Sequence, residues 1–290
     1  MNSKDKRTRQ DATKAGDASS IALAEMLRAA ICAARTAGKM LLTANSSEQT
    51  VEKVARRDIK LTIDRQAEET IIRSLRRYFP DHAILSEECG RIGGESDFLW
   101  IIDPLDGTFN YFRRIPIWCT SIALRHKKEE ILGVIYDPNR GELFHAARGQ
   151  GAFLNGRPIH VSKTPHLKSS VVGLAASVRD EFQEKALVAA RATALHASKA
   201  RSLGCAALDM AYVACGRLDA YFEFGVKEWD VAAGIVIIRE ASGKVSLRRH
   251  ASPTLDIAVS NPGVHRQLLE VISWRQPPPE KRYQQEGRSS

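Results

Sequence analysis

The pattern of apolar and polar positions predicts alternating helices and short strands along the chain. Apolar residues recur at helical spacing over residues 19–42, where Ser19 or Ser20 is a suitable N-cap. Further helices are expected over residues 64–78, 181–196, 205–215, 229–242 and 262–274. Short apolar runs bounded by turn residues predict strands over 83–88, 98–103, 218–224, 244–249 and 256–261.

A different pattern fills residues 118–160, where short apolar runs are separated by turn signals. This spacing predicts a meander of antiparallel strands, with a tight turn at Asn155-Gly156. Helices mixed with antiparallel strands predict a layered α+β architecture. We expect one domain over residues 19–274, flanked by polar, disordered tails at 1–18 and 275–290.

Length and apolar content fit a globular protein with a core of normal size. The chain has 290 residues, of which 43% are hydrophobic and 27% charged. No apolar run approaches the ~18 residues of a membrane span, and the N-terminus lacks the apolar segment of a signal peptide. Five scattered cysteines without a CxxC pair predict reduced, mostly buried thiols, so we expect a cytoplasmic protein.

Charge and histidine content narrow the function classes further. The formal net charge is +9, which is compatible with nucleic acid, with small anionic substrates or with solvated basic tails. No nucleic-acid-binding module is recognisable, so dedicated nucleic-acid binding is disfavoured but stays open. The histidines form no HxxxH or HExxH pattern, which disfavours a zinc site.

The stretch FLWIIDPLDGTFNY (98–111) carries the strongest chemical signal. Asp103 ends a buried apolar run, and Pro104 is expected to end the strand and turn the chain. Asp106 follows, and Gly107 and Thr108 are expected to open a short helix or turn with free backbone amides. Two carboxylates beside such amides suit a divalent cation and a phosphate, because Mg²⁺ prefers oxygen ligands. Alternatively, the pattern is an ordinary aspartate cap beside a turn.

Other acidic residues stand where an element meets a loop. Glu87 follows the apolar run AIL, while Asp64 and Asp230 each begin a predicted helix and could be simple caps. Single acids can be explained as caps, but so many acids at the ends of elements are less easily explained as independent caps. A haloacid-dehalogenase-like phosphatase, with its D-x-D-G-T pattern, fits poorly because D-P-L-D-G-T is one residue too long.

Long motifs resemble the inositol monophosphatase family of Mg²⁺-dependent, lithium-sensitive phosphatases. They are DIKLTID (58–64), ILSEE (84–88), WIIDPLDGTFNYF (100–112), RSLGCAALDMAYVACGRLDAYFEF (201–224) and EWDVAAGIVIIREASG (228–243). They occur in the family's order, and the similarity covers about residues 20–273. The resemblance implies a layered αβαβα sandwich with mixed, largely antiparallel sheets and an active site between two αβ lobes. It also implies a homodimer.

The resemblance implies a metal site for about two or three Mg²⁺ ions. Glu87, Asp103 and the Leu105 carbonyl match the first metal site, and Asp103, Asp106 and Asp230 match the second. Asp64 with Glu87 matches the place where a nucleophilic water is fixed, and Thr108 with Glu87 orients that water. Glu87, Thr108 and Asp64 are therefore the expected catalytic residues.

Substrate contacts are implied in the same way. Asp106, Gly107, Thr108 and Asp230 match substrate-binding positions, the amides of Gly107 and Thr108 holding phosphate. The positions that match contacts to the polyol are Gly204, Cys205, Ala206 and Glu223. Lys53 falls near the family's mobile metal loop. The chain departs from the family pattern at Phe109, at Cys205 and at Ser242, where a Gly-Gly pair is usual.

The expected reaction is Mg²⁺-dependent hydrolysis of myo-inositol 1-phosphate by water. Relatives of the fold also hydrolyse fructose 1,6-bisphosphate, histidinol phosphate or adenosine 3′,5′-bisphosphate, so these substrates stay open. From another class, the basic termini suggest a regulatory protein that binds RNA or the transcription machinery, as some bacterial relatives are thought to do.

Overall fold

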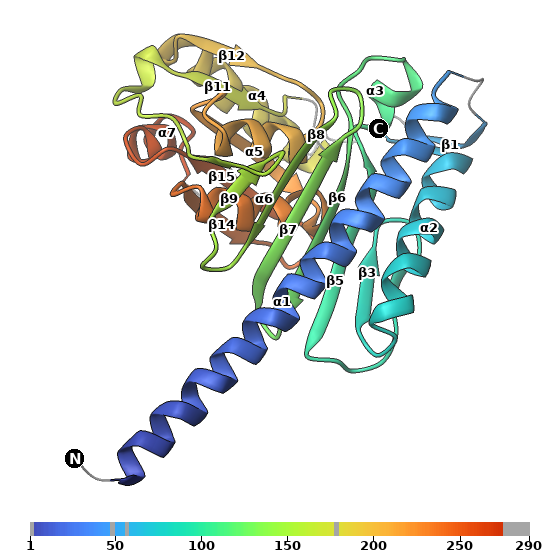
Figure 1. Ribbon diagram of the computed structural model, residues 1–290. Coiled ribbons are helices and arrows are strands. Elements are labelled where there is room, and N and C mark those ends of the chain that lie inside the picture. Colours follow the sequence, from blue (N-terminus) through green and yellow to red (C-terminus); the bar gives the residue numbers. More distant parts are fainter. Residues whose placement is uncertain (1–2, 47–49, 56–57, 177–179, 275–290) are drawn as a thin grey trace, which may run out of the picture.

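The chain folds into five alternating layers of helices and sheets (Figure 1). The structure, a computed structural model, describes residues 3–46, 50–55, 58–176 and 180–274, and the side chains of 3–20 and 53–60 fall outside this description. The tail expected at 275–290 and the side chain of Lys53 therefore lie outside the described residues. The expected boundaries of the domain stay a prediction.

The first layer contains α1 (Ser3–Ala44) and α2 (Thr62–Tyr78), which lie side by side on one face of the large sheet. A stripe of small residues on α1 is fully buried against the sheet: Ala30, Ala33, Ala34, Ala37 and Leu41. The helix begins at Ser3, so the expected start at Ser19 or Ser20 is wrong. Between the two helices, β1 (Val51–Ala55) and β2 (Asp58–Leu61) form a small antiparallel pair.

The second layer is an eight-stranded sheet of order β10-β9-β8-β7-β6-β5-β3-β4. Its strands are β3 (Ala83–Ser86), β4 (Gly90–Ile92), β5 (Phe98–Asp106), β6 (Cys119–His126), β7 (Glu129–Asp137), β8 (Glu142–Ala147), β9 (Ala152–Leu154) and β10 (Arg157–Ile159). Only β3 and β5 pair in parallel. Asn155 and Gly156 both have positive φ, 49° and 77°, which confirms the tight turn expected in the meander.

The middle layer contains α5 (Ala206–Ala214), which is almost entirely buried, and α6 (Glu228–Glu240), which is buried from Val231 to Ile238. α6 crosses β7 at Gly133, where a Cβ would lie 2.3 Å from the carbonyl oxygen of Ala233. No side chain fits there, so this glycine allows the helix to lie directly on the sheet. The apolar, alanine-rich sequences of the two helices follow from burial on all sides.

The last two layers are a five-stranded sheet and a pair of outer helices. The sheet has the order β12-β11-β13-β15-β14 and contains β11 (Val171–Leu174), β12 (Lys199–Arg201), β13 (Ala220–Val226), β14 (Lys244–Arg249) and β15 (Leu255–Ser260). The outer helices are α4 (Asp180–His196) and α7 (His265–Val271), and η1 (Leu167–Ser169) is a short 3₁₀ turn. The expected αβαβα sandwich with largely antiparallel sheets is confirmed.

Two sequence-based expectations need correction. Pro104 does not end its strand: β5 continues to Asp106 through a bulge between Asp103 and Asp106, where a missing N–H is tolerated. The thiols are not mostly buried either, since Cys32 and Cys89 are exposed and Cys215 is half-buried. The other two, Cys119 and Cys205, are buried, and all five are free.

Candidate active site

A pocket of about 250 Å³ lies between the two sheets, where the end of β5 meets the first turns of α5 and α6. All but one of the predicted site residues line it: Glu87, Asp103, Leu105, Asp106, Gly107, Thr108, Gly204, Cys205, Ala206, Glu223 and Asp230. These residues are spread over about half of the chain in sequence, from Glu87 to Asp230. The exception is Asp64, which is not among the residues that line this pocket.

The end of β5 is held in shape by local hydrogen bonds. The buried carboxylate of Asp103 accepts a hydrogen bond from the amide of Leu105 at 3.0 Å, and Thr108 Oγ1 donates to the Leu105 carbonyl at 3.0 Å. Gly107 caps the short helix α3 (Thr108–Phe112) with φ 91°, and a Cβ there would lie 2.9 Å from the Ile117 carbonyl oxygen. The bulge and this glycine turn Asp103, Leu105, Asp106 and Thr108 toward one cavity.

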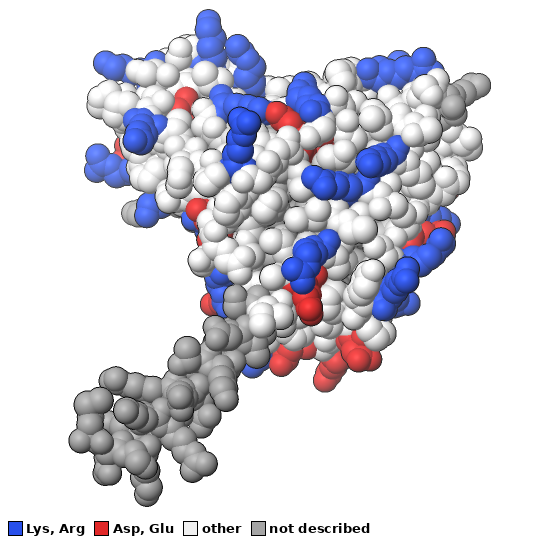
Figure 2. Space-filling model, in the orientation of Figure 1, with Lys and Arg blue, Asp and Glu red and all other residues white. Residues whose placement is uncertain are grey.

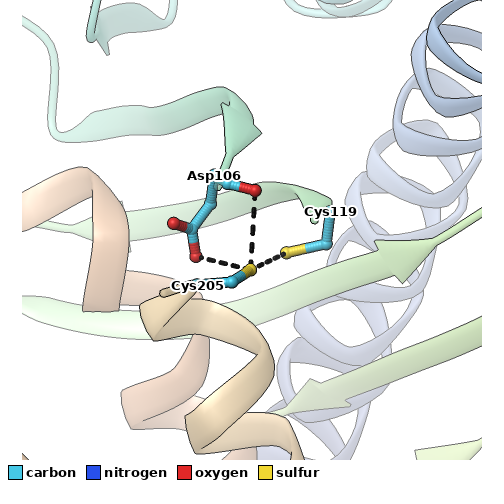
Figure 3. A group of neighbouring side chains, drawn as sticks. All are labelled: Asp106, Cys119 and Cys205. Carbon is cyan, nitrogen blue, oxygen red and sulfur yellow. Dashed lines mark hydrogen bonds between the residues drawn. The ribbon is translucent and has the colours of Figure 1, made fainter. Parts of the chain in front are cut away.

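Asp106, at the end of β5, is fixed by the start of α5. Its Oδ2 accepts a hydrogen bond from the Ala207 amide at 2.6 Å. It also accepts one from Cys205 Sγ at 3.1 Å (Figure 3). Cys205 is the N-cap residue of α5 and is 2% exposed. This cysteine is therefore a small buried thiol at a helix start.

Asp230 and Asp64 hold equivalent positions in different helices. Asp230 is the third residue of α6, and its Oδ2 accepts a hydrogen bond from the amide of Lys227, the N-cap residue, at 3.0 Å. Asp64 is the third residue of α2, and its Oδ2 accepts from the amide of Leu61 at 2.9 Å. Both aspartates thus stabilise a helix start, as the simple capping interpretation required, but only Asp230 lines the pocket.

The carboxylates of the pocket raise one another's pKa values. Burial raises the pKa of Asp103 well above its usual range, and the charges of Glu87, Asp106 and Asp230 raise it further. Burial raises the pKa of Asp106 to about 6, although hydrogen bonds from Ala207 and Cys205 oppose the rise. The pKa of Asp230 is also well above its usual range, through burial and then the charges of Asp106 and Glu87.

The donor set of the pocket suits a hard divalent cation. Glu87, Asp103, Asp106 and Asp230 supply carboxylate oxygens, and Leu105 supplies a carbonyl. No lysine, arginine or histidine is among the described residues that line the pocket. Carboxylates crowded in this way stay ionised where a bound cation dominates the local charge. The residues present therefore fit Mg²⁺.

The far end of the pocket is built by α5 and β13. Gly204, with φ 73°, precedes α5, and Asn110 Nδ2 donates to the carbonyls of Leu203 and Gly204 at 2.9 and 3.3 Å. Glu223 accepts a hydrogen bond from the Tyr221 hydroxyl. This end combines a carboxylate with exposed backbone, which are groups that can contact hydroxyls of a polar ligand.

Sequence reasoning missed several residues of the pocket, of which Asp209 is the most informative. Asp209 lies in the otherwise apolar helix α5, is 2% exposed and lines the pocket. Burial raises its pKa well above the usual range, and the charges of Glu223 and Asp106 raise it further. A single acid within the apolar run AALDMAYVA was the available signal. Tyr221, Ser202, Leu174 and Ala175 also line the pocket.

The family model of the inositol monophosphatase family matches residues 22–274. The chain belongs to the inositol monophosphatase family. A Xylella fastidiosa protein named Nus factor SuhB is 45% identical over 216 residues, covering 73% of this chain and 78% of the relative. A Synechocystis protein named inositol-1-monophosphatase is 43% identical over 233 residues, covering 78% and 80% of the two chains.

Solved structures of the family share the same fold. The extragenic suppressor protein suhB from Bartonella henselae matches with a TM-score of 0.81 at 33% identity, over 86% of this chain and 99% of that chain. An IMPase/NADP phosphatase complexed with Mg²⁺ and phosphate matches with a TM-score of 0.70 at 26% identity, over 80% and 88%. Family membership supports a phosphatase with a metal-dependent site and a small phosphorylated substrate.

Proposed function

We propose that this protein is a Mg²⁺-dependent phosphomonoesterase that hydrolyses inositol monophosphate, with myo-inositol 1-phosphate as the leading substrate. One observation carries the proposal: four carboxylates and the Leu105 carbonyl face a single pocket. Divalent cations bound by these acids would neutralise an anionic phosphate ester, which is the arrangement of metal-dependent phosphatases.

The proposed ligands are divided between two metal positions. Glu87, Asp103 and the Leu105 carbonyl would hold one Mg²⁺, and Asp103, Asp106 and Asp230 would hold another. When bound, Mg²⁺ supplies Lewis acidity that neutralises the phosphate and activates water. Glu87 and Thr108 orient the water, and Thr108 is already fixed by its bond to the Leu105 carbonyl. Asp64 remains the predicted partner of Glu87 in fixing that water, and it is the predicted ligand of a third, more weakly bound cation.

The substrate's organic part is assigned to the end of the pocket formed by Gly204, Cys205, Ala206 and Glu223. The Glu223 carboxylate accepts hydrogen bonds from ring hydroxyls, while the amides of Gly107 and Thr108 are the predicted phosphate contacts. The volume of about 250 Å³ suits one small phosphorylated polyol. We extend the family's homodimer to this chain, together with a cytoplasmic location. No described helix is long and apolar enough to cross a membrane.

A substrate panel tests this function. Phosphate release is measured with Mg²⁺, with and without lithium, from myo-inositol 1-phosphate, fructose 1,6-bisphosphate, histidinol phosphate and adenosine 3′,5′-bisphosphate. We expect Mg²⁺-dependent, lithium-sensitive turnover that is fastest on the inositol ester. Faster turnover of another ester would change the substrate only, whereas no metal-dependent turnover on any of them would reject the phosphatase.

A second candidate is a regulatory protein that binds RNA or the transcription machinery. Relatives of this chain carry the name Nus factor SuhB, and lysines and arginines gather over α4, β11 and β12 (Figure 2). Binding of RNA through phosphates weakens steeply with salt. RNA affinity that does not change with salt would count against binding through phosphates. RNA affinity that survives removal of residues 1–18 and 275–290 unchanged would count against a role of the basic tails.

A further inference from the structure

Two cysteines from distant parts of the chain meet behind the floor of the pocket. Cys119 begins β6 and is fully buried, and Cys205 caps α5. Their sulfur atoms lie 3.7 Å apart, and Cys205 Sγ lies 3.1 Å from Asp106 Oδ2 (Figure 3). One ligand atom from each of Asp106, Cys119 and Cys205 lies within 4.8 Å of the other two. The proposed phosphatase reaction uses neither sulfur as a ligand or a nucleophile.

These spacings match the edges of a tetrahedral zinc site. Two thiolates bound to one tetrahedral Zn²⁺ at about 2.3 Å lie about 3.8 Å apart, and a thiolate and a carboxylate oxygen lie about 3.5 Å apart. The sulfur pair therefore already has the required separation, and Asp106 Oδ2 is within a few tenths of an ångström of its place beside Cys205. Mg²⁺ disfavours sulfur ligands, so this trio selects a softer cation than the carboxylate pocket does.

The first turn of α5 holds Asp106 in place. The Ala207 amide donates to Asp106 Oδ2 at 2.6 Å, and the positive end of the helix dipole there favours anions. Burial raises the pKa of the Cys119 and Cys205 thiols, so a bound cation is needed to convert them to thiolates. Cys205 also lines the pocket, so a cation can enter from there and a water molecule can supply the fourth ligand.

We propose that Cys119, Cys205 and Asp106 form an inhibitory binding site for a thiophilic divalent cation such as Zn²⁺. Binding releases one proton from each thiol and leaves two thiolates and one carboxylate around the cation. Asp106 Oδ2 then exchanges its bonds to Ala207 and Cys205 for a bond to Zn²⁺. Asp106 is also a proposed Mg²⁺ ligand. Zn²⁺ bound to its Oδ2 therefore displaces the carboxylate from the position that Mg²⁺ requires. The inhibition rests on the proposed function, but the binding does not.

Cation binding is tested on the full chain, kept reduced with a phosphine so that no disulfide forms. Cd²⁺ is titrated alone, and the sulfur-to-cadmium charge-transfer absorption in the ultraviolet is recorded. We expect one Cd²⁺ per chain with two thiolates, and about half of the absorption per bound Cd²⁺ in C119A. The matched control is C32A, which removes an exposed cysteine outside the site and should leave the absorption unchanged.

Inhibition is tested with Zn²⁺ at saturating Mg²⁺. We expect Zn²⁺ to inhibit C119A about tenfold or more weakly than the parent chain or C32A, because one thiolate ligand is lost. If C119A does not fold, C205S replaces it in the Cd²⁺ measurement, where activity is not needed. Equal inhibition of the parent and C119A, or Cd²⁺ binding without thiolate absorption, would overturn the proposal and place the cations on the carboxylates. A chain that binds Cd²⁺ through thiolates but hydrolyses no ester would reject the phosphatase alone.

Discussion

The beginnings of α2 and α6 are almost the same in local structure and differ in what surrounds them. Each helix carries an aspartate at its third position, Asp64 in α2 and Asp230 in α6. In each, one carboxylate oxygen accepts a hydrogen bond from the N-cap amide, at 2.9 and 3.0 Å. Both helices follow directly on a strand, β2 or β13. Measured by capping alone, the two aspartates are interchangeable.

The difference lies in the acids around them. Asp230 lines the pocket with Glu87, Asp103 and Asp106, and burial and then the charges of Asp106 and Glu87 raise its pKa. Asp64 is 3% exposed and is not among the residues that line the pocket. A helix start therefore provides a fixed carboxylate, but the packing around the helix decides whether that carboxylate faces the pocket.

The largest expected effect is the loss of activity in D230N. Asparagine keeps an oxygen that can accept the Lys227 amide, so the start of α6 is preserved while the ligand charge is removed. We expect kcat/KM at saturating Mg²⁺ to fall by roughly 10²–10³-fold, the cost of removing a preorganised electrostatic contact. D103N should fall as far. Steady-state phosphate release measures both variants.

The matched control for these variants is D81N, which removes an exposed aspartate outside the pocket. Its activity should equal that of the parent. If D230N or D103N retained near-normal turnover at saturating Mg²⁺ while D81N did the same, the assigned ligands would be wrong.

A smaller loss is expected in D64N. If Asp64 fixes the attacking water with Glu87, replacing its carboxylate by the asparagine amide should lower kcat by about 10–100-fold. Loss of an outer partner of a metal site has an effect of this size. The capping bond to Leu61 survives in this variant, because the amide oxygen still accepts. If kcat were unchanged in D64N, Asp64 would act only as a helix cap and, unlike Asp230, would have no role in the reaction.

Removal of Mg²⁺ should make the stability depend on pH in a characteristic direction. Without a cation, the pKa of Asp106 in the folded chain is about 6, against about 3.9 when unfolded, and the pKa values of Asp103 and Asp230 are raised as well. Between the unfolded and folded values the folded state holds more protons, so the free energy of unfolding falls as pH rises.

We therefore expect the metal-free chain to melt at least about 2–4 °C lower at pH 7.5 than at pH 5.5, a shift equivalent to about 1 kcal/mol. Added Mg²⁺ should raise the Tm more at pH 7.5 than at pH 5.5, since protons compete with the cation for the same oxygens. Scanning calorimetry at both pH values measures this. A Tm of the metal-free chain that rose with pH would contradict the crowding of acids described above.

Sequence patterns predicted the fold well wherever local periodicity and burial agree. The meander and the helices were predictable because their apolar spacing is regular. The edge strands β4 and β12, each three residues long, carry no such pattern, and tertiary pairing alone makes them strands. The continuation of β5 past Pro104 was missed because a bulge cannot be read from a proline.

The site was predictable in its residues but not in its arrangement. The motif around Asp103 and Asp106 and the acids at helix starts pointed to a cation site before any family was considered. The difference between Asp64 and Asp230 was not predictable, because both stand at the same place in the same local pattern. Nor was the contact between Cys119 and Cys205, which depends on how α5 packs against β6.

The smallest expected effect separates the two helix starts by stability. In D64A the Leu61 amide loses its acceptor, which should cost about 1 kcal/mol, the usual effect of a lost cap. In D230A the same local loss is opposed, because alanine removes a desolvated charge that repels Asp106 and Glu87 in the metal-free chain. At pH 7.5 without Mg²⁺, D230A should thus be destabilised less than D64A, and urea denaturation measures both. Equal destabilisation would mean that the repulsion among the pocket acids does not extend to Asp230, and the contrast between α2 and α6 would then rest on activity alone.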